Sequence, residues 1–87
     1  MTLGAPSGGK AAWRLSAPPD LSSLPSPLGA HYRLTLDGTG RVVSLRRVSV
    51  APASAAPGVE SLLRGLTFLP VPGVPAAGEL DVRVSRD

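Results

Sequence analysis

Apolar and polar positions alternate strictly through residues 31–36. In an extended chain one face would be entirely apolar and the other polar, with Tyr32, Leu34 and Leu36 set against His31, Arg33 and Thr35. The next four residues, Asp37-Gly38-Thr39-Gly40, supply two glycines that tolerate positive φ and an aspartate that can accept bonds from the following backbone. The pattern predicts a half-buried strand that enters a tight antiparallel hairpin.

The second arm of this hairpin, residues 41–50, is rich in valine but changes phase. Val43 and Leu45 share one face, whereas Val48 and Val50 have the opposite parity. Two interpretations stay open. A bulge at Arg46-Arg47 would bring both apolar pairs to the core face. Otherwise the far half of the strand places its apolar side chains toward solvent.

Residues 59–66 change to a helical period. Apolar side chains recur at i, i+3, i+4 and i+7, namely Val59, Leu62, Leu63 and Leu66. Glu60 lies four residues before Arg64 on the polar side, where the two can form an ion pair. We expect a short amphipathic helix here. Residues 79–85 alternate again and predict a closing strand.

The first third of the chain differs in composition, because proline, glycine and serine dominate it. We expect residues 1–30 to form a flexible arm. Alternation around Trp13 indicates one short strand at residues 10–17, and the prolines of residues 18–30 predict an extended connection. The folded domain is therefore expected at residues 31–87.

These elements predict a fold class. At 87 residues the chain has room for one core, since a domain of this size buries only about 60–65% of its unfolded surface. The helix stripe and the strand faces must be buried together. We predict an α+β fold, a small antiparallel sheet of three to four strands with one short helix packed on one face, in the order β-β-β-α-β.

Composition excludes several classes of protein. The chain has no cysteine, and therefore no disulfide framework and no thiolate nucleophile. No apolar run approaches the roughly 18 residues that a membrane span requires. The first residues also lack the basic start and apolar stretch of a secretory signal. We expect neither a membrane span nor a secretory signal in this chain.

Catalytic patterns are missing as well. His31 is the only histidine, without acidic neighbours at ligand spacing, and the serines of residues 22–26 lie in a loop without a GxSxG turn. The stretch SGGK at residues 7–10 lacks the leading glycine of a phosphate loop. We predict a protein that is not an enzyme, with no catalytic residue, no cofactor and no metal site.

A mild positive charge suggests nucleic-acid binding as an alternative function. The formal net charge is +3, and eight of the nine basic residues are arginine. Four of them could form a basic patch for nucleic acid, in a cytoplasmic adaptor: Arg33, Arg41, Arg46 and Arg47. No aromatic residues are interleaved with them to stack bases, which makes nucleic acid the less favoured partner. Folding alone leaves Arg46 and Arg47 unexplained.

Four stretches of the chain carry a resemblance to a known family through their order: YRLTLDGTGRVVSLRRV, VESLLRGL, LTFLP and ELDVRVS. In them the chain resembles the C-terminal domain of TonB-type energy transducers of the bacterial cell envelope. The resemblance covers residues 32–85, and Phe68-Leu69-Pro70 fits the aromatic-x-proline ending that follows the helix in that family. Departures are Leu66 where the family often has tryptophan, Arg47 where an apolar residue is usual, and a long proline-rich loop after Pro70.

The resemblance implies a protein-binding module of this TonB/TolA-like α+β type, in which a sheet edge pairs with a short segment of an outer-membrane transporter. It would place the chain in the periplasm, in a transport role. The membrane anchor and stalk of such transducers are not found in this sequence, so the location itself stays unassigned.

An exposed strand edge can bind a partner through its backbone, by adding a strand. The closing strand is the expected edge, because its outward side chains are charged with mixed sign. The expected contact residues are Glu79, Asp81, Val82, Arg83 and Ser85. The partner would be a protein or peptide segment, or a second copy of the chain. An edge that is merely protected against aggregation is the simpler alternative.

Overall fold

The computed structural model describes residues 2–5, 11–75 and 78–86. Its elements follow the chain in this order: β1 (Thr2–Gly4), β2 (Trp13–Leu15), β3 (Leu28–Leu36), β4 (Val42–Ala51), a 3₁₀ turn (Ala53–Ala55), α1 (Ala56–Arg64), β5 (Phe68–Pro70) and β6 (Glu79–Arg86).

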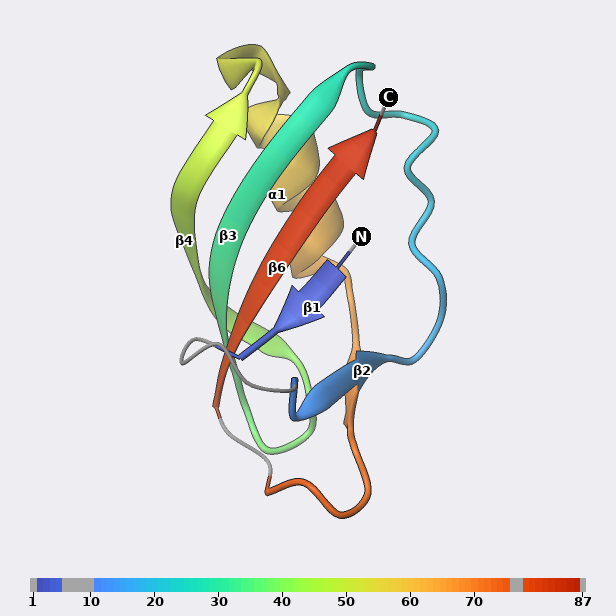
Figure 1. Cartoon of the computed structure of the whole chain (residues 1–87), viewed down its shortest axis with the longest axis vertical. Helices are drawn as coiled ribbons and strands as arrows, with labels where there is room; N and C mark the ends of the chain where they lie inside the picture. Colours follow the sequence, from blue (N-terminus) through green and yellow to red (C-terminus); the bar gives the residue numbers. More distant parts are fainter. Residues whose placement is uncertain (1, 6–10, 76–77, 87) are drawn as a thin grey trace.

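The four-stranded sheet has the order β1-β6-β3-β4, and every neighbouring pair is antiparallel. Figure 1 shows α1 behind this sheet, on the side of β3 and β4. Strands β2 and β5 form a separate two-stranded sheet. The expected α+β class, with a small antiparallel sheet and one short helix, is confirmed. The observed order of elements contains two short strands, β1 and β5, that the expected β-β-β-α-β order lacks.

The hairpin between β3 and β4 is held by its turn residues. Asp37 Oδ1 accepts hydrogen bonds from the backbone N–H of Thr39 (2.8 Å) and Arg41 (3.0 Å). Gly40 has φ of 87°, and a Cβ there would lie 1.9 Å from the carbonyl oxygen of Phe68. Gly40 is therefore required twice, once for the turn and once for the close approach of β5.

The phase change in β4 is produced by two register shifts. His31 pairs with Ser49 and Tyr32 with Arg47, which leaves Val48 as an extra residue. Val43 is extra in the same way, at the second register shift, near the start of β4. The bulges bring Val42, Leu45 and Val50 to the core face. Val43 and Val48 are 62% and 51% exposed, so the bulge expected at Arg46-Arg47 does not turn both apolar pairs inward.

The core lies between α1 and the sheet. The largest fully buried side chains come from both layers: Tyr32, Leu34, Val59, Leu63, Phe68, Leu80, Val82 and Val84. Only one of them, Phe68, lies outside β3, β6 and α1. The two predicted strand faces and the helix stripe therefore meet as the apolar periods require.

Described residues in the first third of the chain pack against the rest of the fold, in contrast to the flexible arm expected at residues 1–30. Residues 2–4 form β1 and pair with β6, in the register Thr2 with Arg83. Trp13, Leu24 and Leu28 are buried in the core. Arg86 donates hydrogen bonds to the carbonyl oxygens of Leu21 (2.8 Å) and Leu24, so the proline-rich connection is fastened to the end of β6. The SGGK stretch at residues 7–10 lies outside the described residues.

Candidate functional site

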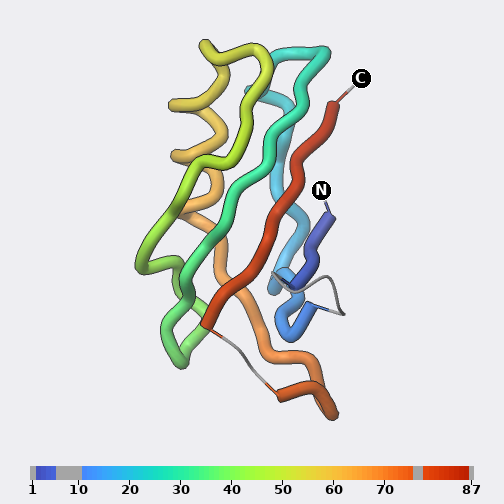
Figure 2. The backbone as a smooth tube through the Cα atoms, turned by 60° about the vertical axis from the view of Figure 1, so that its left-hand side comes forward, coloured from blue at the N-terminus to red at the C-terminus, as the bar shows by residue number. Residues whose placement is uncertain are grey.

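The sheet has two terminal strands, and they differ in length. β1 covers β6 only along Asp81–Arg83, whereas β4 is a ten-residue strand whose outer side pairs with no described strand. Figure 2 shows β4 at one side of the row of strands and β1 at the other. Thr67 bridges Arg41 just before β4 begins, and the free edge therefore starts at Val42.

The closing strand is only partly open, because β1 pairs with its residues 81–83. Val82 is fully buried and lies between Leu3 of β1 and Tyr32 of β3. The other expected contact residues lie on the opposite face of β6: Glu79, Asp81, Arg83 and Ser85. The sequence did not indicate this partial cover, because the three residues of β1 show no period of their own.

The free edge of β4 has a regular middle between its two bulges. Residues 44–47 pair in unbroken register with Thr35–Tyr32 of β3. The bulge residues Val43 and Val48 flank this stretch and expose their side chains. The edge thus has a regular four-residue stretch, in which alternate residues direct their N–H and C=O outward, and an exposed valine lies at each end of it.

The expected basic patch is only partly assembled. Arg33, Arg46 and Arg47 line one shallow hollow with Val48, whereas Arg41 lies at the hairpin end of β4. Arg33 and Arg46 are directly opposed on the face away from the helix. Arg33 Nε lies 3.0 Å from Asp81 Oδ1, which neutralises one of these two charges.

Asp81 joins two side chains on that outer face. Burial acts to raise the pKa of Asp81, but the hydrogen bond and charge of Arg33 outweigh it and leave the pKa below its ordinary value. His31 Nε2 lies 3.6 Å from Asp81 Oδ2 and makes no hydrogen bond. Within residues 2–5, 11–75 and 78–86, no group of three His, Cys, Asp or Glu could hold a metal ion.

Arg47 has a structural role that its sequence position did not reveal. It lies on the helix side of the sheet, opposite Tyr32, and its Nη2 is 2.7 Å from Glu60 Oε2 in α1. The Tyr32 hydroxyl donates to the same oxygen at 2.9 Å. Hydrogen bonds from Arg47 and Tyr32 hold the pKa of Glu60 below its ordinary value. The pKa of Tyr32 is raised, chiefly by burial and then by the hydrogen bond to Glu60. This network ties β3, β4 and α1 together.

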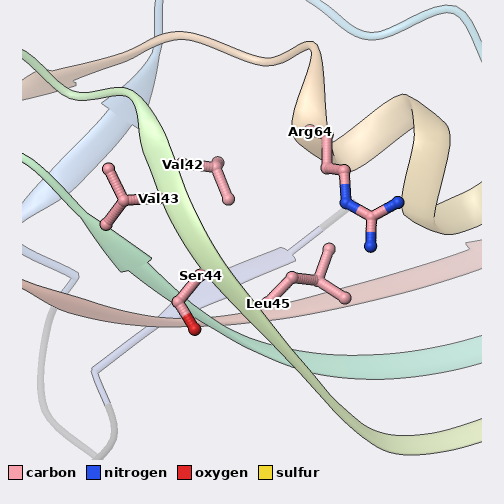
Figure 3. A pocket seen from close by; sticks show the side chains of 5 residues that line it. All are labelled: Val42, Val43, Ser44, Leu45 and Arg64. Atoms are coloured by element: carbon pink, nitrogen blue, oxygen red, sulfur yellow. The ribbon is translucent and has the colours of Figure 1, made fainter.

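A groove lies beyond this network, between the start of β4 and the end of α1. Its lining residues are Val42, Val43, Ser44, Leu45 and Arg64 (Figure 3). In that view the side chains of Val42 and Leu45 lie on the side of the helix, and Val43 points the other way. A second hollow continues past the helix end and shares Val42 and Arg64 with the groove. Its other lining residues are Arg41, Gly65, Leu66 and Thr67.

The arginine of this groove is largely available. Arg64 is 65% exposed, and its nearest carboxylate oxygen, Glu60 Oε1, lies 3.8 Å away. The sequence paired Arg64 with Glu60 and gave Val42 no role. The missed signal was the phase change in β4, which turns Val42 and Leu45 to the same side of the strand.

Comparison with known proteins does not indicate a function for this chain. No protein-family model matches the chain, and neither curated proteins nor solved structures give a match. Among the described residues, no helix has the length and apolar character needed to cross a membrane. The TonB-type resemblance therefore stays a prediction.

Proposed function

We propose that this chain is a non-enzymatic protein-interaction module that binds an extended partner segment by strand addition to β4. The observation that carries the proposal is the unpaired outer side of β4, with a regular ladder at residues 44–47 and exposed valines on both sides of it. Unpaired backbone donors and acceptors of such a strand can bond an added strand, and alternate side chains then set the register.

The resemblance to TonB-type C-terminal domains supports the same mode of contact. Under it the partner would be a short segment of an outer-membrane transporter, and the working compartment would be the periplasm. The contact strand differs from the one expected from the sequence, because β1 occupies the side of β6 along Asp81–Arg83.

Peptide selection tests the proposal directly. The probe is a phage-displayed library of random peptides about nine residues long, enough to cover a typical strand. Selected peptides are synthesised, and backbone amide exchange is measured by NMR with and without peptide. Strand addition slows exchange at amides within residues 44–47 and leaves β6 unchanged. Protection at β6 with loss of β1 pairing, or no protected strand at all, would contradict the proposal.

The alternative is a nucleic-acid adaptor, and one observation favours it: Arg33, Arg46 and Arg47 share a hollow. Two of these arginines are already ion-paired with Asp81 and Glu60. The aromatic residues Trp13, Tyr32 and Phe68 are all buried, so none of them is open to stack a base. Titration with fluorescent DNA over a salt series decides this. Binding that falls steeply with salt and is abolished by Arg46→Glu would establish the adaptor.

A further inference from the structure

The position of the groove beside the free edge determines what an added strand would meet. Side chains of a strand paired with β4 point alternately toward the helix side and toward the outer face. Those on the helix side enter the groove, where Val42 and Leu45 are half-buried and apolar. Leu66 continues this apolar lining past the end of α1. The groove therefore favours apolar side chains at alternate positions.

The exposed charges nearest the middle of the edge are arginines. Arg64 and Arg41 line the two hollows at the start of β4, and Arg46 lies on the outer face. Among the nearby carboxylates, Glu60 is only 16% exposed and already accepts bonds from Arg47 and Tyr32. Asp37 is held in the hairpin turn, where it accepts bonds from Thr39 and Arg41. No ion pair joins Arg41 or Arg46 to a carboxylate within the described residues. In this part of the chain Arg46 therefore has no ion pair, and Arg64 is largely exposed with only the 3.8 Å contact to Glu60.

From this arrangement we infer that the β4–α1 groove selects an acidic, partly apolar extended segment, with aspartate or glutamate side chains bound by Arg64 and Arg46. This inference rests on the proposed strand addition and names the chemistry of its partner. Arginine suits the purpose, since its planar group can bind a carboxylate through two hydrogen bonds.

A second copy of the chain fits the edge poorly. Pairing β4 with β4 would bring Arg46 and Arg47 of each copy close to those of the other, and facing like charges destabilise a strand pair. Charge complementarity therefore points to a different, anionic chain and away from a homodimer formed through this strand.

The test uses peptides selected on the whole chain and synthesised with both ends blocked, so that only side chains supply carboxylates. Fluorescence polarisation measures their affinity for the wild type, Arg64→Gln and Arg46→Gln. Arg14→Gln is the matched control, because it removes one exposed arginine from β2, outside the four-stranded sheet. We expect acid-rich peptides, a loss of roughly tenfold with Arg64→Gln or Arg46→Gln, and no change with the control. Peptides whose acids are replaced by amides should bind equally weakly to all variants.

Each outcome separates this inference from the proposed function. Peptides that protect residues 44–47 but carry no excess of acids, and bind Arg64→Gln as well as the wild type, would overturn the inference and keep strand addition. Failure to find any peptide that protects β4 would overturn both. Concentration-dependent dimerisation with protection of residues 44–47 would replace the anionic partner by a second copy. Affinity for acid-rich peptides that weakens from about 50 to about 500 mM salt supports the inference.

Discussion

Single residues decide whether the hairpin and the second sheet can coexist. Gly40 combines a positive φ with a backbone contact, since the amide N–H of Phe68 also donates to the Gly40 carbonyl oxygen at 2.9 Å. A methyl group at this position would meet the carbonyl oxygen of Phe68. A side chain therefore cannot be added at Gly40 without separating β5 from the hairpin.

Gly40→Ala should destabilise the protein by at least about 2 kcal/mol, through backbone strain and the clash with Phe68. Gly38→Ala is the matched control, because nothing lies within 4 Å of a Cβ built there. It should change the free energy of unfolding by no more than about 0.5 kcal/mol. Urea unfolding followed by circular dichroism measures both. Equal effects of the two substitutions would show that the close approach of β5 does not exist.

Glu60 makes the stability of the protein depend on pH. Its pKa is lowered in the folded state by Arg47 and then Tyr32, so its contribution is present above the unfolded-state pKa. That contribution is lost as pH falls through the lowered folded-state pKa. We expect Glu60→Gln to flatten the decline of the melting temperature between about pH 5 and about pH 2. Glu79→Gln, on the exposed end of β6, should leave the decline steeper than Glu60→Gln does. If the melting temperatures of the two variants declined in parallel with falling pH, the proposed role of Glu60 would be contradicted.

At the scale of elements, β4 shows how a bulge sorts side chains that the sequence alone leaves ambiguous. Val48→Thr changes an exposed bulge residue and should alter stability by no more than about 0.5 kcal/mol. Val50→Thr places a hydroxyl on the core face and should cost about 1 kcal/mol. Thermal unfolding of the pair measures the difference. A larger loss at Val48 would mean that the register of β4 is shifted by one residue.

The short strand β1 carries a prediction of its own. Deleting residues 1–5 removes the pairing of Thr2–Gly4 with β6, while β6 keeps its contacts with β3. The shortened chain should stay folded by circular dichroism and exchange amide protons faster within Asp81–Arg83. The β3–β4 hairpin amides serve as the internal control, since deletion should leave them unchanged. Unaltered exchange in β6 would show that β1 does not pair there in solution.

The predictable elements are those with a strong local period. Strict alternation located the strands at residues 31–36 and 79–85, and the helical spacing of Val59 and Leu63 located α1. β1 has only three residues and β5 contains Pro70, so neither shows a period. The partner strand decides their conformation, and this information is not local in the sequence. The groove escaped prediction for the same reason, because it depends on which strand remains unpaired.

At the scale of the whole molecule, one small core carries the stability. Leu63 is fully buried between α1 and the sheet, whereas Leu62 is only half-buried. Leu63→Ala should cost about 2–5 kcal/mol, a large share of the stability of a domain this size. Leu62→Ala removes the same atoms from a more accessible position and should cost clearly less. Urea denaturation midpoints compare them, and equal losses would place the helix in a different rotation.

The pairing of β1 with β6 also determines how the molecule is oriented when it is tethered. Thr2 is opposite Arg83, and β1 is the terminal strand of the sheet on the side away from β4. A linker, a bead or a neighbouring domain attached ahead of β1 would therefore leave from the side remote from the groove. Immobilisation through the N-terminal end should present β4 to the solution, and one sensor surface can then compare every variant with the same accessible edge.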